Sequence, residues 1–331
     1  MPSADMPIDT LSDVLKAVRL QSALYFFVDA SAPWAEEAPE ACLVASRVHE
    51  GASDVIEYHV VMSGECHGGL VGGEPIHLET GDIIVFPQGD RHWMASDPHL
   101  RPALDPDLFA RLRSQEVAIP EVSVGGTGTK TLLLCGFMAC DATPHNPLLR
   151  ALPRVLVVRA KASKNPTLAH FSEMALRESR QGDAGSSCVL ARLSELMFIE
   201  AIREYVQSLG SERPGWLGGL RDQWVGSALS HLHQRPAFPW TIETLAKEVG
   251  MSRSVLADRF SELVGVPPMQ YLTDWRMQLT ATMLRNSSEG LARIAESVGY
   301  GSEAALSRAF KRSVGQSPAA YRAASHRRAL A

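Results

Sequence analysis

The sequence predicts an α+β protein with a β-rich N-terminal part and an all-helical C-terminal part. Two observations predict this division. Short apolar runs alternate with Gly, Pro and Asp turns up to about residue 140, which is typical of a sandwich or barrel. The last third contains two helix-turn-helix patterns in tandem. With 331 residues, 45% of them hydrophobic and 21% charged, the chain is long enough for two globular domains.

The β-rich domain is expected to span residues 1–145. It begins with a predicted helix, Leu11 to Leu20, and a predicted strand, Ser22 to Val28. The further β-rich runs between turn residues are 41–45, 56–62, 68–71, 75–78, 82–86 and 130–136. Regular turns between so many short strands favour a single β-rich domain.

Residues 146–215 are expected to connect the two domains. They contain predicted helices over Leu168–Arg180 and Ser187–Leu209, followed by a turn-rich linker that lets the domains reorient. Apolar residues follow one side and a further edge of the second helix: Leu190, Leu193, Met197, Ala201 and Tyr205, then Leu196, Ile199 and Val206. A stripe this wide favours packing against a second copy, so we expect a homodimer. The alternative is that both helices only cover the β-rich domain.

The first helix-turn-helix pattern runs from Trp240 to Phe260. Apolar residues at helical spacing predict its first helix: Ile242, Leu245, Ala246 and Val249. Gly250 can take the positive φ that ends this helix, and Ser252 can cap the next one. The residues of the second helix that we expect to be buried are Val255, Leu256, Phe260 and Leu263. Those expected to face outward are Arg253, Ser254, Ala257 and Asp258.

The second pattern runs from Leu291 to Phe310 and follows the same plan. The expected core residues of its first helix are Ile294, Ala295 and Val298. Gly299 is the predicted turn and Ser302 the predicted cap. The inward residues of the second helix are Ala305, Leu306, Phe310 and Val314, and the outward ones are Glu303, Ala304, Ser307, Arg308 and Lys311.

The two patterns form an internal repeat of roughly fifty residues. Each continues from Phe to Gly in five steps and from Gly to Tyr in six: Phe260, Gly265 and Tyr271, then Phe310, Gly315 and Tyr321. A single helix–Gly–helix pattern is common, whereas two copies with matching spacing are hard to obtain by accident. We therefore expect an all-α domain over residues 216–331.

The stretch from about residue 220 to 325 resembles the DNA-binding domain of AraC/XylS-type transcription regulators. The matching residues are Ile294-Ala295, Gly299-Tyr300, Ser302, Phe310-Lys311, Gly315, Pro318 and Tyr321-Arg322. The resemblance implies a seven-helix domain whose two modules are bridged by a long helix, here Met269 to about Arg285. It also implies base contacts from Ser254, Ala257 and Asp258 and from Glu303, Ala304, Ser307 and Arg308. Arg253 and Lys311 are expected to contact phosphates.

Asp258 departs from the pattern of many relatives, which have a basic or amide side chain at this position. An aspartate repels phosphate, but it can accept a hydrogen bond from a cytosine amino group. The alternative is that Asp258 pairs with Arg253 or with a residue of the bridging helix.

The N-terminal part carries a second resemblance. Gly81, Pro87, Gly89 and His92 have the spacing Gly-x5-Pro-x-Gly-x2-His, which resembles the second motif of cupins. The first motif matches only at its end, where Glu57 is followed after six residues by Gly64, and the paired histidines expected before Glu57 are absent. The resemblance implies a cupin-like β-barrel with an altered metal-ligand set.

A candidate metal or effector site follows from strand alternation, which puts Glu57 and His59 on one face. If that face is the interior, His59 and His92 can converge, and Cys135 on a later strand can join them. Two imidazoles and a thiolate would suit zinc. The alternative is a hydrogen-bonded core histidine at residue 59 and a small buried apolar residue at 135.

The redox candidates are Cys66, Cys135 and Cys140. His59, His92 and Cys135-Gly136 together resemble a subfamily of AraC-type activators that includes the reactive-chlorine-sensing regulator, in which thiol oxidation is the trigger. This chain has no cysteine near residue 24, where the partner thiol is expected. The alternative is that these cysteines are inert core residues. Five cysteines, an odd number, fit a reducing cytoplasm.

The charge is divided between the two parts of the chain. The net charge is −5, but residues 216–331 hold 14 Lys and Arg against 9 Asp and Glu, a net charge of +5. The preceding 215 residues hold 18 basic and 28 acidic side chains, a net charge of −10. The basic part is therefore the one expected to meet phosphates. We predict no signal peptide and no transmembrane run, and we expect a cytoplasmic protein without a membrane partner.

The two resemblances imply a sequence-specific DNA-binding transcription regulator, an activator, whose cupin-like domain senses a small molecule, a metal or an oxidant. Its expected partners are double-stranded operator DNA, RNA polymerase, the effector and a second copy. The alternative is a dioxygenase-like cupin metalloenzyme fused to a DNA-binding domain. Catalytic cupin iron usually needs three or more convergent ligands, and only His92 and Glu57 match the motifs, so we expect no enzyme.

Overall fold

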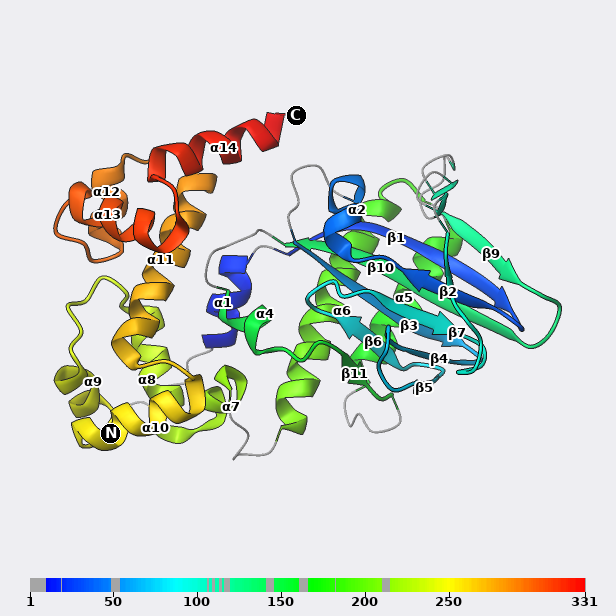
Figure 1. Ribbon diagram of the computed structural model, residues 1–331, viewed down its shortest axis with the longest axis horizontal. Coiled ribbons are helices and arrows are strands. Elements are labelled where there is room, and N and C mark those ends of the chain that lie inside the picture. The colour runs from blue at the N-terminus through cyan, green and yellow to red at the C-terminus, as the bar shows by residue number, and fades with distance from the viewer. Residues whose placement is uncertain are drawn as a thin grey trace. The chain divides into compact units, whose positions relative to one another are not determined.

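The computed structural model describes residues 10–18, 20–48, 54–105, 107–108, 111–112, 115, 120–140, 146–160, 166–181, 183–209 and 215–330. The chain folds into two compact units. A β unit comprises residues 20–142 and 152–208, and a helical unit comprises residues 1–19, 143–151 and 209–331. Figure 1 shows the elements of both units.

The β unit contains two sheets. The six-stranded sheet has the order β11 (Leu156–Val158), β6 (Ile83–Phe86), β3 (Asp54–Ser63), β10 (Lys130–Cys140), β1 (Leu20–Ser31) and β9 (Glu121–Gly125). The five-stranded sheet has the order β5 (Ile76–Glu79), β4 (Glu65–Leu70), β7 (His92–Ala95), β2 (Ala35–Ala38) and β8 (Ala103–Leu104). Among the described residues the strands do not close into one hydrogen-bonded ring, so the predicted barrel takes the form of a two-sheet cupin-like fold.

The core of the β unit lies between the sheets. It combines residues of the larger sheet, such as Phe26, Phe86 and Phe137, with Cys66 and Met94 of the smaller one. Because side chains alternate along a strand, the intervening residues of the larger sheet face the other way. That outer face is covered by α5 (Thr167–Gln181) and α6 (Ser186–Ser208), which pack on each other and on this sheet (Figure 1).

Residue 136 must be glycine because the ring of Tyr58 on the neighbouring strand lies against its Cα atom. A Cβ atom there would lie 2.2 Å from the ring of Tyr58, which is paired with it across β3 and β10. The hydroxyl of Tyr58 instead passes outward and donates to Ser194 Oγ of α6 at 2.7 Å. This contact ties the covering helix to the sheet and leaves the neighbouring residues, His59 and Cys135, on the inner face.

One predicted strand is wrong. Residues 41–45 belong to a helix, α2 (Ala41–Val48). Ala41, Val44 and Ala45 are buried whereas Leu43 is 68% exposed, which is helical spacing in a short apolar run that resembles a strand. The runs that were not predicted as strands are β2, β7, β8, β9 and β11, which have five residues or fewer.

The helical unit is built around a long helix, α11 (Pro268–Asn286). The described residues 215–330 form eight helices: α7 (Trp216–Arg221), α8 (Gln223–Gln234), α9 (Ile242–Glu248), α10 (Arg253–Val264), α11, α12 (Leu291–Ser297), α13 (Glu303–Val314) and α14 (Pro318–Leu330). Two further helices, α1 (Thr10–Val18) and α4 (Pro147–Ala151), pack on α8, α11 and α7 within this unit.

Candidate functional site

The first helix-turn-helix module consists of α9, a turn and α10. Thr241 and Thr244 form a capping box at the start of α9, and Gly250 has φ +71° in the turn. Ser252 Oγ then accepts a hydrogen bond from the Val255 amide at 3.4 Å. The predicted turn and cap of this module are therefore both present in the structure, and they set the direction in which α10 leaves the core.

The outward residues of α10 are placed as expected, with one difference in pairing. Arg253, Ser254 and Asp258 are exposed, and Ala257 is half-buried. The guanidinium of Arg253 bonds the carboxylate of Glu243 on α9 at 3.0 Å, so it does not pair with Asp258. No ion pair joins Asp258 to another described residue within 4 Å. Its carboxylate is therefore exposed on the face of α10.

The prediction that Val255 belongs to the core is wrong. Its side chain is 52% exposed, whereas Leu256 and Phe260 are fully buried. These two lie four residues apart and form the inward ridge of α10. Val255 precedes that ridge by one residue, about 100° around the helix, so it lies to one side of the buried ridge. An exposed branched side chain therefore stands among the outward residues.

The second module repeats this plan with α12 and α13. Gly299 has φ +79°, and a Cβ there would lie 2.6 Å from the carbonyl oxygen of Ala237, so this turn requires glycine. Ser302 Oγ accepts from the Ala305 amide at 3.2 Å and caps α13. Leu306 and Phe310 are fully buried under the helix. The remaining core residues expected on α12 are buried as well: Ile294, Ala295 and Val298.

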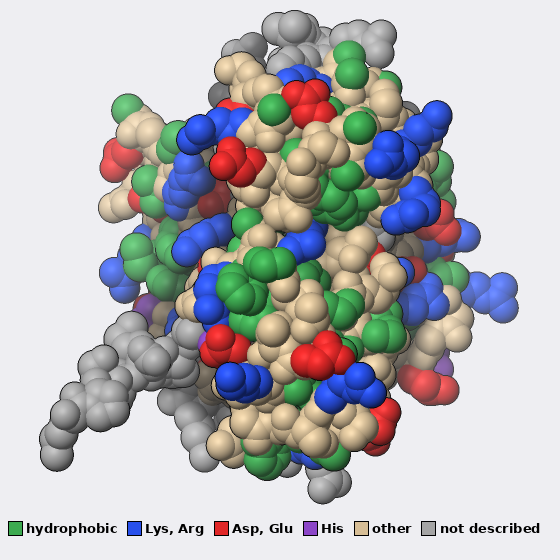
Figure 2. Space-filling view, turned by 90° about the vertical axis from the view of Figure 1, so that its left-hand side faces the viewer, with side chains coloured by type: hydrophobic (Ala, Val, Ile, Leu, Met, Phe, Trp, Pro, Cys, Tyr) green, Lys and Arg blue, Asp and Glu red, His purple; other side chains and the backbone are tan. Residues whose placement is uncertain are grey.

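The outward face of α13 carries unpaired positive charge. Glu303, Ala304, Arg308 and Lys311 are exposed, and Ser307 is half-buried. Within the described residues neither Arg308 nor Lys311 forms an ion pair. Figure 2 looks onto the helical unit and shows Lys and Arg side chains spread over the visible surface rather than gathered in one patch. Such a face suits a polyanion whose charges are themselves spread along a rod.

The β unit places His59, His92 and Cys135 side by side between the two sheets. The Nδ1 atom of His59 lies 2.9 Å from Cys135 Sγ, and its Nε2 atom lies 2.8 Å from His92 Nε2. His92 Nδ1 lies 2.8 Å from the carbonyl oxygen of Asp90. All three side chains are buried. They come from β3, β7 and β10, so both sheets contribute to this chain of hydrogen bonds.

The carbonyl of Asp90 determines which atom donates and which accepts in each of these three hydrogen bonds. A carbonyl only accepts, so His92 Nδ1 carries the proton and its Nε2 is the acceptor when the ring is neutral. His59 must then donate from Nε2 and accept at Nδ1 from the Cys135 thiol. Burial lowers the pKa of His92 to about 4 and lowers that of His59, which the neighbouring His92 lowers further. Both rings are therefore neutral near pH 7.

The three donors do not fit a single zinc ion. Cys135 and His92 bond opposite nitrogens of the His59 ring, so they point at different sides of it. Two imidazole nitrogens bound to one tetrahedral zinc ion would lie about 3.3 Å apart, given zinc–nitrogen bonds of about 2.0–2.1 Å. The Nε2 atoms of His59 and His92 lie 2.8 Å apart, which is a hydrogen-bond distance. Among the described residues no group of three His, Cys, Asp or Glu side chains is arranged to hold a metal ion.

Glu57 is the unusual group of this site. It is 1% exposed, and neither carboxyl oxygen has a hydrogen-bond partner. Its Oε2 atom lies 3.6 Å from His92 Nε2, which is beyond hydrogen-bond distance. Burial raises the pKa of Glu57 to about 8, so the carboxyl is protonated near pH 7. A buried acid without partners is costly and marks a position where a ligand can supply them.

A cavity of about 70 Å³ adjoins these groups. Its polar lining is Glu57, His59, His92 and Cys135, together with Glu36, Glu37 and Arg111. Its apolar lining includes Phe26, Val28, Met94, Leu133 and Phe137. Trp34 also lines it, and the buried indole N–H of Trp34 has no hydrogen-bond partner. Trp34 was not predicted as a site residue, because the loop between β1 and β2 that carries it matches neither strand alternation nor a cupin motif.

The redox candidates lie in surroundings that suppress thiolate formation. Burial raises the pKa of Cys66 to about 12 and also raises that of Cys135. Cys140 ends β10, and its side chain lies outside the described residues. A reactive thiol is usually accessible and has a lowered pKa, and Cys66 and Cys135 have neither property.

Comparison with known proteins matches both parts of the chain. The family described as Cupin matches residues 9–207, and the family described as helix-turn-helix domain matches residues 245–324. A putative AraC-like transcription regulator of Streptomyces antibioticus is 34% identical over 95% of this chain and 98% of its own length. The chain belongs to the AraC family of transcription regulators.

Two further comparisons cover different lengths of the chain. The RCS-specific HTH-type transcriptional activator RclR of Escherichia coli K12 is 25% identical and covers 82% of this chain and 86% of its own. The crystallised DNA-binding domain of AdpA, in complex with a target DNA, is 34% identical over 32% of this chain and 96% of that one, with a TM-score of 0.31. Membership of the AraC family makes this chain a DNA-binding transcription regulator with a cupin-like domain rather than an enzyme.

No helix in the described part of the chain has both the length and the apolarity that crossing a membrane requires.

Replacing Glu57 with Gln should make the chain increasingly more stable relative to wild type as the pH rises from 6.5 to 8. The unfolded glutamate titrates near pH 4.3, about four units below the folded value of about 8, so the folded state holds more protons in this window. The Glu57 carboxyl therefore lowers stability as the pH rises, by up to about 2 kcal/mol over these 1.5 units. The buried histidines are partly protonated when unfolded at pH 6.5 and act in the opposite direction, but equally in wild type and variant, so the difference between the two chains isolates the carboxyl. Urea unfolding of the full chain at several pH values measures this difference.

The matched control is Glu74→Gln, at an exposed position of the same unit, which should keep the wild-type slope. An unchanged slope in the Glu57→Gln variant would show that this carboxyl does not titrate as its burial implies.

Proposed function

We propose that this chain is an activator that reads a bipartite DNA operator by placing α10 and α13 in two successive major grooves. The observation that carries this proposal is the repeated module: in each, a positive-φ glycine and a capping serine present a helix whose outer face is exposed. A major groove admits one α-helix, and its base edges carry a distinct pattern for each pair.

The bridging helix has a suitable length for this arrangement. With 19 residues, α11 is about 28 Å long, close to the roughly 34 Å that separates successive turns of one groove. It packs against α10 on one side and against α12 and α13 on the other. The spacing of the two reading helices is therefore set by a rigid element rather than by a loop.

The proposed contacts differ between the two reading helices. In α13, Arg308 reads a guanine and Lys311 contacts phosphate, while Glu303, Ala304 and Ser307 complete the face. In α10, Ser254, Ala257 and Asp258 face the bases. Arg253, which is paired with Glu243, contacts phosphate. The unpaired cations of α13 give it the larger share of affinity, because phosphate contacts dominate binding strength.

Replacing Arg308 with Ala should weaken operator binding by about 1–3 kcal/mol, because a bidentate arginine–guanine contact contributes that much. The operator is first identified by pulling genomic fragments down with the full chain and sequencing them. Affinities are then measured by electrophoretic shift at one fixed salt concentration. Arg293→Ala, an exposed position on α12 outside the reading face, is the control and should bind as wild type. Equal affinity of the Arg308→Ala variant would remove this residue from the interface.

Val255 extends the reading face of α10 beyond the residues implied by family resemblance. It is 52% exposed in the first turn of the helix, next to Ser254. A branched apolar side chain in a major groove suits the methyl group of thymine, which the other bases lack. We therefore assign Val255 to thymine recognition within the first half-site.

Substituting deoxyuridine for thymine, one position at a time, tests this assignment because it deletes only the methyl group. At one half-site position the wild-type chain should lose about fourfold in affinity, equivalent to about 0.8 kcal/mol for one buried carbon. The Val255→Ala variant should bind both versions of that position equally. If wild type and variant respond alike at every position, Val255 does not read a methyl group.

We also propose that the cavity of the β unit binds the effector, a small and largely apolar molecule with one hydroxyl or carbonyl group. The unpartnered groups on its wall support this: the protonated Glu57 can both donate and accept, and the Trp34 indole can donate. An oxidant trigger gains no support from the buried thiols.

Propan-2-ol and acetone, which are small enough for a cavity of about 70 Å³, should raise the melting temperature of the wild-type chain, by about 2–4 °C for each kcal/mol of binding free energy. Glycerol, which is polar throughout, should not. Leu133→Trp, which fills the cavity from β10, should remove the response to both compounds while the chain remains folded by circular dichroism. Equal stabilisation of this variant would place the binding site elsewhere.

Dimer formation and contact with RNA polymerase complete the proposed mechanism. Leu190, Leu193, Met197 and Ala201 of α6 are buried within the chain. Leu196 on its second edge is 44% exposed, and Met174 on α5 is 51% exposed. We propose that this edge packs against a second copy, and that effector binding changes how the paired chains present their reading helices to the operator and to the polymerase.

A further inference from the structure

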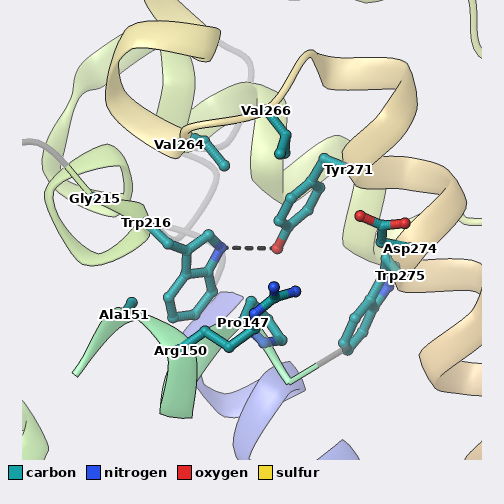
Figure 3. A pocket seen from close by; sticks show the side chains of 10 residues that line it. All are labelled: Pro147, Arg150, Ala151, Gly215, Trp216, Val264, Val266, Tyr271, Asp274 and Trp275. Atoms are coloured by element: carbon teal, nitrogen blue, oxygen red, sulfur yellow. Dashed lines mark hydrogen bonds between the residues drawn. The ribbon is translucent and has the colours of Figure 1, made fainter. Parts of the chain in front are cut away.

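We propose that the helical unit carries a second effector site, a pocket for a small aromatic zwitterion of the amino-acid type. The pocket has a volume of about 290 Å³, at the lower end of the range of about 300–1,000 Å³ for ligand sites. It lies among α4, the start of α7, the turn between α10 and α11, and the first half of α11 (Figure 3). It is separate from the cavity of the β unit.

Three aromatic side chains form the walls: Trp216, Tyr271 and Trp275. Each is at most 6% exposed. Val264 and Val266 close the pocket on the side of the α10–α11 turn, and Figure 3 shows the aromatic rings arranged around a common space. Flat aromatic faces at several angles suit an aromatic ring, which gains both area burial and ring–ring contacts there.

The aromatic walls are rigid before any ligand arrives. Trp216 Nε1 donates to Tyr271 Oη at 2.8 Å, and that oxygen lies 2.7 Å from His233 Nε2. The His233 ring stacks on Trp275 with 4.0 Å between centroids and 25° between planes. One chain of contacts therefore fixes all three walls. A site fixed in this way loses little entropy when it binds.

The charged residues of the pocket determine the ligand class. Arg150 of α4 is exposed, and Figure 3 shows its guanidinium reaching into the space between the aromatic side chains. No ion pair joins Arg150 to a described residue. Asp274 of α11 lies at the other side, where Gln270 Nε2 donates to it at 2.8 Å. A ligand carboxylate can pair with Arg150 and a ligand ammonium with Asp274. The aromatic walls suit a ring between these two charges.

The location gives such a ligand a route to DNA binding. Val264 is the last residue of reading helix α10, and Tyr271 and Trp275 lie in the first half of α11. The amide of Gly215, at the start of α7, also bonds the Leu263 carbonyl oxygen at 2.7 Å. A molecule in this pocket would contact both ends of the turn that orients α10. Occupancy would therefore favour one angle between α10 and the bridging helix.

Isothermal titration calorimetry of the full chain tests the proposal with three ligands that share an indole ring. L-Tryptophan carries both charges, indole-3-propionate lacks the ammonium, and tryptamine lacks the carboxylate. We expect tryptophan to bind tightest and each of the others to bind about tenfold more weakly, as the loss of one charge-assisted hydrogen bond implies. Operator DNA is absent, so the result does not depend on the proposed DNA contacts.

Two conservative variants assign the charges. Arg150→Gln should bind tryptophan and tryptamine with equal affinity, because it no longer recognises the carboxylate. Asp274→Asn should bind tryptophan and indole-3-propionate equally, while it keeps an acceptor for Gln270. Arg293→Gln, outside the pocket, should reproduce the wild-type ranking. The proposal is overturned if tryptophan shows no saturable binding, if either analogue binds as tightly as tryptophan, or if both pocket variants leave the ranking unchanged.

Discussion

An edge-to-face aromatic pair packs each reading helix against the helix that follows it. Phe260 of α10 meets Tyr271 of α11 at 5.8 Å and 70°, and Phe310 of α13 meets Tyr321 of α14 at 5.4 Å and 79°. Between the two rings of each pair the chain turns at a glycine with φ of +84° or +83°. The pair fixes the reading helix against the helix that follows it, and so determines which side chains face outward. The proposed DNA-reading surface is supported in part by this repeated contact.

The two copies of the pair have different surroundings. Tyr271 also bonds Trp216 and His233, which belong to the helices before the first module, and the pocket of Figure 3 opens beside it. Tyr321 instead lies 5.9 Å from the Arg285 guanidinium of the bridging helix, in a cation–π contact. One repeat therefore supports a ligand pocket and the other a closed core. The first module is the one through which a ligand of the helical unit can act.

The β unit buries several polar side chains between its two sheets. The chain from Cys135 through His59 and His92 to the Asp90 carbonyl uses every donor and acceptor in one direction, so burial costs little there. Glu57 and the Trp34 indole are left without partners beside the same cavity. A satisfied network adjoining unsatisfied groups is the arrangement expected of a site that its ligand completes.

The sequence alone determined the α+β division, the tandem modules, their glycine turns and their serine caps, because these depend on residue spacing and on local backbone preferences. It also placed Glu57 and His59 on one face of a strand by their period of two. Only the tertiary structure decided that Ala41–Val48 is helical, that Val255 is exposed, and that Cys135 and His92 bond opposite nitrogens of one ring. The pocket around Trp216 and Arg150 likewise joins segments far apart in the chain. Burial and ring geometry arise from packing between distant segments, and no local pattern encodes them.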